Sequence, residues 1–505
     1  MAGRGCVFVE SQGKATSLGR SVSQLGLSLD IISTQGNLFC HPQDLSTPVI
    51  DPMFREAPRE PVNKTVLQKI ARTAGVYEFY LVATDPDQDG DVIASDIALV
   101  LPQVALLRVN LAALDIKSVK IAFKEASLID VKLAWPGITR RIIDRALGTA
   151  LSSKGKSLAI SRSNSALLGI FSNAPQVYGT AIFEMESLDC GAAFQAAIPV
   201  THANAHDINK LFDLTSGTKL QAREGSCETT RLAPWNYSEA IIECAQELRL
   251  PIRDIAQGMH QLFEQQSLTY PRTNSRDLSS WAVEWIEAAA NKHGLYDLDF
   301  EHVQQVTNDF GIECPRPLSE VDFQTPLRLL GTDQAIMAML TRNLILCGLP
   351  HQVSYPDTTN LPAWAKHLPW QRIKTRRLPW IQRRPEPGLN ILAPDVAILK
   401  IIAEHKLGRP IAQVRLAEKF IARQLTNSYL SLTSKGREWI RLTPPQLLDL
   451  PSFKQFELEL TKQTTMPPAM RAAWLIERLG HEISTRVQSH LEQTQPTSNG
   501  SHHLA

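Results

Sequence analysis

Two short apolar segments that run directly into acidic residues limit the folds open to this chain. The segment 6–9 ends at Glu10, and the segment 78–84 ends at Asp85. Continuous apolar runs of this length are typical of buried strands in a parallel sheet. A helical pattern follows at 92–101, so the order is strand, acidic turn and helix, which predicts an α/β fold. Functional sites in such sheets lie at the carboxyl ends of strands, where Glu10 and Asp85 are expected.

Size and composition indicate a globular protein with three or four domains. The chain has 505 residues, of which 43% are apolar and 20% are charged. We expect neither a membrane span nor export, because no apolar run is long enough to cross a bilayer and the N-terminus lacks a secretory signal. The seven cysteines form no CxxC pair, which argues against a zinc site and favours a reducing cytoplasm.

The net charge of +1 hides a local asymmetry. Between residues 351 and 425 there are thirteen Lys and Arg residues against five Asp and Glu residues. A basic region joined to an acidic one suits a DNA enzyme with a metal site, although a solvated basic face is an alternative. The part at 351–390 also contains Trp364, Trp370 and Trp380, which either stack on single-stranded bases or form a packed linker.

The acidic turn after the second apolar segment is a candidate metal site. Asp85, Asp87 and Asp89 alternate along the chain, and alternate residues of an extended segment face the same side. Three carboxylates on one side favour a hard cation, Mg²⁺ or Mn²⁺. The alternatives are an exposed acidic turn and a calcium loop. An EF-hand loop needs a glutamate where this chain has Asp96.

These two acidic segments together resemble a known module. Val7 to Lys14, combined with Asp85-Pro86-Asp87, resembles the Toprim module shared by topoisomerases and bacterial primases. That module uses a glutamate at the end of its first strand and a DxD pair at a later strand. The resemblance therefore implies that Glu10 acts together with Asp85 and Asp87, and it leaves several functions open.

A tyrosine in the middle of the chain separates those functions. An amphipathic helix at 252–263 leads into the segment 268–273, Leu-Thr-Tyr-Pro-Arg-Thr, which resembles the active-site signature of type IA DNA topoisomerases. Pro271 biases Tyr270 towards an extended backbone, so Arg272 is expected on the same side as the phenol. A guanidinium at that position favours the phenolate and also holds a phosphate.

Three further segments resemble motifs of the same family. They are 139–148, similar to ARRxxDRxxG; 158–167, similar to SAGRVQSxAL; and 407–410, similar to the start of GIGRPST. The resemblance therefore spans roughly residues 5–440 in the family's order. It implies that DNA is bound by Arg140, Asp144, Arg162, Asn164 and Arg409.

The sequence also departs from the family pattern. The DPDREGE motif has lost its arginine and both glutamates, and three other polar residues of the family are replaced. The residues at these positions are Gln88, Asp89, Asp91, Asn164, Asn274 and Ile312. These changes support an alternative in which the chain is a catalytically decayed topoisomerase that acts as a single-stranded DNA-binding or partner module.

The resemblance implies a multidomain α/β protein with a toroidal type IA architecture. Its expected parts are a Toprim α/β domain, helical DNA-binding domains, a β-rich arch and a lid that carries Tyr270. The expected segments are the Toprim domain at 1–127, helical domain at 128–176 and 391–475, arch at 177–232 and 348–390, lid at 233–347, and C-terminal helix and tail at 476–505.

The resemblance also implies a reaction. Tyr270 would attack a DNA phosphate, with Glu10, Lys14 and Arg272 as the other catalytic residues and Mg²⁺ or Mn²⁺ on Asp85, Asp87, Asp89 and Glu10. No ATP is expected, because Gly155-Lys156-Ser157 resembles the end of a P-loop but Ala150 replaces its first glycine. The expected partner is single-stranded or negatively supercoiled DNA in the cytoplasm, and the outcome is relaxation or decatenation. A primase-like Toprim polymerase is a further alternative, which would leave Tyr270 unexplained.

Overall fold

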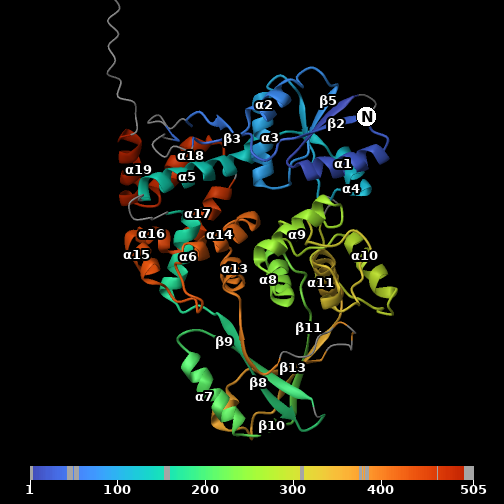
Figure 1. Ribbon diagram of the computed structural model, residues 1–505, viewed down its shortest axis with the longest axis vertical. Helices are drawn as coiled ribbons and strands as arrows, with labels where there is room; N and C mark the ends of the chain where they lie inside the picture. Colours follow the sequence, from blue (N-terminus) through green and yellow to red (C-terminus); the bar gives the residue numbers. More distant parts are fainter. Residues whose placement is uncertain are drawn as a thin grey trace, which may run out of the picture. The chain divides into compact units, whose positions relative to one another are not determined.

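The computed structural model describes residues 4–42, 49–50, 56–152, 160–190, 192–306, 312–374, 378, 380, 386–462 and 464–493. The chain divides into two compact units, unit 1 at 1–170 and 438–505 and unit 2 at 171–437 (Figure 1). The P-loop-like Gly155-Lys156-Ser157 and the arginines at 376, 377, 383 and 384 lie outside the described residues.

Unit 1 contains a five-stranded sheet in the order β2-β1-β5-β6-β7. Its strands are β1 (Gly5–Val9), β2 (Leu29–Ser33), β5 (Phe79–Val82), β6 (Leu106–Arg108) and β7 (Ser127–Leu128). The first four are parallel, and β7 pairs antiparallel with β6. Every residue of β1 is buried, as expected for a central strand covered on both faces. The predicted strand at 6–9 is therefore confirmed, and the one predicted at 78–84 is present but limited to Phe79–Val82.

Helices and a pair of two-residue strands lie around this sheet (Figure 1). They are α1 (Gln12–Gln24), α2 (Lys64–Ala71), α3 (Gln88–Val100) and α4 (Ile116–Lys124), with β3 (Phe39–Cys40) paired to β4 (Glu60–Pro61). Phe8 and Tyr80 of the sheet form a core with Ile70 of α2 and Ile93 of α3. The helix predicted at 92–101 is present, but it begins earlier, at Gln88, because the Asp87 side chain caps its first turn.

The rest of unit 1 is helical and joins distant parts of the sequence. Its elements are η1 (Val131–Ala134), α5 (Trp135–Leu151), α6 (Arg162–Asn173), α15 (Ser434–Leu442), α16 (Pro445–Leu448), α17 (Leu450–Thr461), α18 (Pro468–Glu477) and α19 (His481–Gln493). Helix α5 packs against α3 and also against α17, α18 and α19. The division between the units falls within α6 and α15.

Unit 2 contains a seven-stranded sheet in the order β10-β8-β9-β13-β12-β11, with β14 paired to β8. The strands are β8 (Gly179–Ser187), β9 (Ala193–Val200), β10 (Gln221–Ala222), β11 (Glu224–Thr230), β12 (His351–Pro356), β13 (Trp370–Lys374) and β14 (Gly388–Ile391). Helix α7 (Ala205–Ser216), which was not predicted, packs on this sheet by stacking Phe212 on Phe183 at 4.5 Å between ring centroids.

Unit 2 contains further helices besides α7. They are α8 (Tyr237–Leu248), α9 (Ile252–Glu264), α10 (Ser280–Asn291), η3 (Leu327–Leu329), α11 (Thr332–Cys347), α12 (Ala363–Lys366), α13 (Pro394–Glu404) and α14 (Pro410–Ala422). Helix α11 is buried along most of its length and packs against α8, α9 and α10. The predicted amphipathic helix at 252–263 is α9 and is confirmed.

Two of the three tryptophans in the segment 351–390 are buried, and Trp364 is half-buried. Trp370 and Trp380 are buried, and the Trp370 indole donates to the carbonyl oxygen of Ala365 at 2.8 Å. Neither indole is exposed for base stacking in the structure. Separately, none of the helices in the described ranges combines the length and apolar character that a membrane crossing requires.

Candidate active site

Two adjacent parallel strands of unit 1 bring the first predicted site residues to one edge of the sheet. β1 pairs with β5 from Gly5–Phe79 to Phe8–Val82, so Glu10 and Asp85 both lie just beyond the carboxyl ends of neighbouring strands. Lys14 comes from the first turn of α1, whose N-cap is Ser11. The sequence prediction that Glu10 and Asp85 share this edge is consistent with the described strand register.

Lys14 and Asp85 form a buried ion pair at this edge. The Lys14 Nζ atom lies 2.8 Å from Asp85 Oδ1, and the two side chains are only 2% and 5% exposed. A carboxylate and an ammonium group this deep are tolerated only when they neutralise each other. The positive charge of Lys14 is therefore held beside the acidic turn.

The other aspartates of the turn have separate partners. Asp87 accepts hydrogen bonds from the backbone N–H groups of Asp89 and Gly90, both at 2.9 Å. Asp89 lies inside α3 and pairs with Arg141 at 3.0 Å. The sequence prediction placed Asp85, Asp87 and Asp89 in one extended segment. For Asp89 this prediction is wrong, because α3 begins at Gln88.

The turn is closed by Arg108 from the neighbouring strand β6. The buried Arg108 guanidinium donates to the backbone oxygens of Thr84 and Asp85 and pairs with Asp91 at 3.3 Å. Burial raises the pKa of Asp91, and Arg108 opposes that increase. Sequence reasoning did not identify Arg108, since nothing near it in the chain marks it as a partner of the turn.

A cage of three carboxylates does not fit this arrangement. Among the residues that the structure describes, no three His, Cys, Asp or Glu side chains are grouped so that they could hold a metal ion. The carboxylates of Asp85 and Asp89 face Lys14 and Arg141. Magnesium in phosphoryl-transfer sites often needs only one or two protein carboxylates, because water and substrate phosphates supply the other ligands.

A charged cluster elsewhere in unit 1 brings together the predicted DNA-binding residues of α5 and α6. Arg162 donates from Nε to Asp144 at 2.8 Å and also contacts Glu457 of α17. Arg140 contacts Glu457 at 3.1 Å and Gln88. Burial opposes protonation of Arg162, but the carboxylates of Asp144 and Glu457 raise its pKa overall.

Asn164 lies in the first turn of α6, two residues after Arg162. Its side chain is buried, and its Oδ1 atom has no hydrogen-bond partner in the described part of the chain. A buried amide oxygen without a partner is costly, which is why such atoms often mark ligand sites.

Tyr270 lies in unit 2, directly after α9. Its side chain is 1% exposed, and its ring packs edge-on against Phe263 of α9 with centroids 5.5 Å apart. The N–H of the preceding residue, Thr269, donates to the carbonyl oxygen of Arg316, and the Thr269 hydroxyl accepts from the Arg316 N–H, both at 3.0 Å. The segment around Tyr270 is therefore held from α9 on one side and from the segment 314–317 on the other.

That second segment belongs to the stretch 312–317, which begins at Ile312, one of the expected departures from the family pattern. The neighbouring Glu313 instead accepts from Arg316 at 2.7 Å and from the Ser279 hydroxyl at 2.8 Å. The segment keeps its position beside Tyr270 through backbone pairing, although it offers no imidazole.

Arg272 is tied to the beginning of α8. The Tyr237 N–H donates to Thr273 O at 3.1 Å. Burial raises the pKa of Tyr237, and Arg272, which is hydrogen-bonded to that phenol, opposes the increase. Tyr237 is a residue near the candidate nucleophile that the sequence motifs did not reveal.

A cavity of about 680 Å³ joins the Tyr270 segment to the predicted DNA-binding turn at 407–410. Asn274 and Arg276 line it from one side, and Lys400, Lys406 and Gly408 line it from the other. Arg409 follows Gly408 immediately and is the N-cap residue of α14. The structure thus brings two motif segments of unit 2 to one cavity, whose charged lining is mixed: Arg276, Lys400 and Lys406 lie there with Glu239, Glu243 and Glu404.

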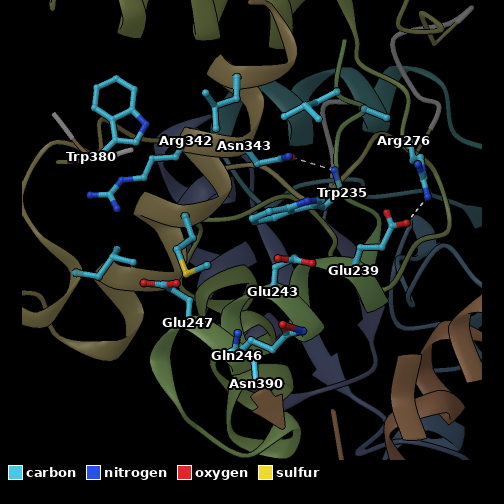
Figure 2. Close-up of a pocket in the computed structure, with 15 residues that line it drawn as sticks. Trp235, Glu239, Glu243, Gln246, Glu247, Arg276, Arg342, Asn343, Trp380 and Asn390 are labelled. Atoms are coloured by element: carbon cyan, nitrogen blue, oxygen red, sulfur yellow. Dashed lines mark hydrogen bonds and ion pairs between the residues drawn. The ribbon is translucent and has the colours of Figure 1, made fainter. Parts of the chain in front are cut away.

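A larger cavity of about 850 Å³ lies beside α8 (Figure 2). Glu239, Glu243 and Glu247 follow one another along α8, while Arg342 and Asn343 face the cavity from α11. Burial raises the pKa of Glu243, Lys400 opposes the increase, and Glu239 and Glu247 add to it. None of the site residues predicted from the sequence lines this cavity.

Comparison with known proteins agrees with the predicted fold. No model of a known protein family matches the sequence. The structure is similar to that of full-length topoisomerase I from Thermotoga maritima, with a TM-score of 0.64 and 16% identity over 97% of this chain and 91% of that one. This similarity confirms the multidomain α/β fold that the motifs predicted. The parallel α/β sheet, the helical segments and the β-rich sheet are like those of a type IA topoisomerase.

Proposed function

We propose that this chain is a type IA DNA topoisomerase that cuts one DNA strand without ATP, passes DNA through the break and reseals it. The observation that carries the proposal is Tyr270, followed by Pro271 and Arg272, in a chain with a topoisomerase I fold. The edge of the sheet with Glu10, Lys14 and Asp85 supports it, because that edge offers an acid and a cation for phosphoryl transfer.

In this reaction the phenol of Tyr270 gives up its proton to water, its oxygen attacks a DNA phosphorus atom, and the bond to the 3′ oxygen breaks. The product is a 5′-phosphotyrosyl bond and a free 3′-hydroxyl, to which Glu10 gives the proton. Arg272 and Lys14 stabilise negative charge on the phosphate. The proposal requires Tyr270 and Glu10 to meet at the same phosphate, and the covalent bond keeps the energy needed for resealing.

The remaining predicted residues have binding roles in the proposal. Arg140, Asp144, Arg162, Asn164 and Arg409 would hold single-stranded DNA in the helical segments. Magnesium, or manganese, would be held by one or two carboxylates among Glu10, Asp85, Asp87 and Asp89, with water and phosphate as the other ligands. Bound there, it would neutralise phosphate charge and orient the 3′ end.

The wider assignments belong to the same proposal. The type IA resemblance implies the segment boundaries of the sequence analysis and a cytoplasmic location beside the chromosome. It also implies a substrate of single-stranded or negatively supercoiled DNA. Relaxation and decatenation are both compatible with the chemistry.

A second function is favoured by one observation. In the described residues the acidic turn is tied to basic partners and gathers no three-carboxylate site. A decayed enzyme that only binds single-stranded DNA needs no metal site, so it accounts for this arrangement without the water and phosphate ligands that an active enzyme would require.

Relaxation of negatively supercoiled plasmid with Mg²⁺ and without ATP tests the proposal. We expect stepwise relaxation by the natural protein, loss of relaxation in Tyr270→Phe, and normal activity in Tyr296→Phe, whose tyrosine is exposed in the same unit. Absence of relaxation by the natural protein, with single-stranded DNA binding intact, would favour the binding module instead.

A further inference from the structure

Glu457 lies where two predicted DNA-binding arginines converge. It comes from α17, more than half the chain away from α5 and α6, which carry Arg140 and Arg162. Its Oε2 atom lies 3.1 Å from Arg140 Nη2, and its Oε1 atom contacts Arg162 Nη1. Each carboxylate oxygen therefore accepts from a different guanidinium.

This geometry matches that of a bound phosphate. Two guanidinium groups that approach separate oxygens of one anion form the arrangement by which arginines grip phosphate groups. Glu457 is charged in this position: burial alone would raise its pKa, but Arg162 and Arg140 together lower it. The positive charge that nucleic acid would need is thus already neutralised from within the chain.

Each of the two arginines has another partner besides Glu457. Arg162, whose side chain is 4% exposed, is also bound by Asp144 and lies over the Phe456 ring at 5.1 Å. Arg140 has a second contact with Gln88. The Glu457 side chain is 23% exposed, against 4% for that of Arg162.

We propose that Glu457 is a built-in competitor for the nucleic-acid phosphate, which must leave Arg140 and Arg162 before a DNA strand can bind them. The inference rests on the proposed function and adds regulation to its binding site. A DNA phosphate exchanges places with the carboxylate, so Glu457 weakens binding and reduces its dependence on salt.

Glu457→Gln tests this inference, and Glu459→Gln is the matched control. Both changes remove one negative charge from α17, but Glu459 pairs with Lys462 and not with the two arginines. Binding of fluorescent oligothymidine is measured by anisotropy over a range of salt concentrations. We expect Glu457→Gln to bind about 3- to 10-fold more tightly at low salt. The slope of log K against log salt should steepen by about 0.7 for each additional DNA phosphate that the arginines neutralise.

The outcomes separate the inference from the proposed function. Tighter binding and a steeper salt slope in Glu457→Gln alone support the inference. Equal effects in both variants, or weaker binding in Glu457→Gln, overturn it while the natural protein still binds DNA. If neither the natural protein nor the variants bind oligothymidine, the proposed function fails and the inference fails with it.

A second measurement needs no variant and decides the matter if Glu457→Gln does not fold. Carbodiimide labelling of carboxylates in the natural protein is followed by mass spectrometry with and without oligothymidine. Under the proposal, labelling of Glu457 increases several-fold when oligothymidine is present, because the carboxylate is displaced into solvent. Labelling that stays unchanged or decreases while DNA is bound would overturn it.

Discussion

Replacement of Gly90 by alanine is expected to destabilise unit 1, even though alanine is the better helix former. Gly90 lies in the first turn of α3, where a Cβ atom would lie 1.9 Å from the carbonyl oxygen of Asp85 and 2.9 Å from its carbonyl carbon. These are backbone atoms, which cannot rotate aside as a flexible side chain would. The turn that carries Asp85 must therefore shift to admit a methyl group.

The size of the effect follows from two opposing contributions. Helix propensity favours alanine over glycine by about 1 kcal/mol. Overpacking costs about 1–3 kcal/mol, and a collision with fixed backbone belongs at the upper end of that range. The expected net loss of about 1–2 kcal/mol lowers the melting temperature of a domain of this size by about 2–8 °C.

Thermal unfolding followed by circular dichroism measures this change, with Gly148→Ala as the matched control. Gly148 is also a helical glycine of unit 1, but its Cβ would meet nothing closer than Ile160 O at 3.9 Å. We expect Gly148→Ala to melt at the natural temperature or above it, and Gly90→Ala to lose relaxation activity as well as stability. A Gly90→Ala protein that melts at or above the natural temperature would refute the reasoning.

Two further predictions concern charged contacts. Lys14→Met should lower the stability of unit 1 by about 3–5 kcal/mol, because Asp85 stays buried without its ammonium partner. In thermal unfolding, the double variant Lys14→Met/Asp85→Asn should recover part of this loss. A double variant that recovers none of it would contradict the buried ion pair. Hydrogen bonding with Ser187 and with the Ala192 backbone, and then with Arg372, lowers the pKa of Cys190 to about 7. Its alkylation by iodoacetamide should slow as pH falls through about 7, with the midpoint moved upwards in Arg372→Met; an unchanged midpoint would exclude a role for Arg372.

The sequence predicted those parts of the fold whose signals are local. The apolar segment 6–9 is a fully buried strand, and the apolar spacing at 252–263 is the helix that leads to Tyr270. The sequence pattern predicts too late a start for α3, since the first turn of this helix is polar and carries no apolar periodicity. That error mattered, because it placed Asp89 in an extended segment rather than in a helix opposite Arg141.

The partners of the site residues could not be predicted, because they depend on contacts between distant parts of the chain. Glu457 reaches Arg140 from α17, and Arg108 reaches the acidic turn from β6. Neither residue belongs to a motif, and a glutamate on an amphipathic helix is usually a solvated one. Pairings of this kind follow from the packing of α5 against α17 and of β5 against β6, which no sequence pattern specifies.

The most direct test of the central claim is covalent capture of DNA by Tyr270. A single-stranded oligonucleotide labelled at its 3′ end is incubated with the protein and Mg²⁺, stopped with detergent and analysed for protein-linked label. We predict that the 3′ label becomes attached to the protein, that a 5′ label does not, and that Tyr270→Phe captures neither. Capture of the 5′ label, or capture that persists in Tyr270→Phe, would contradict the proposed chemistry.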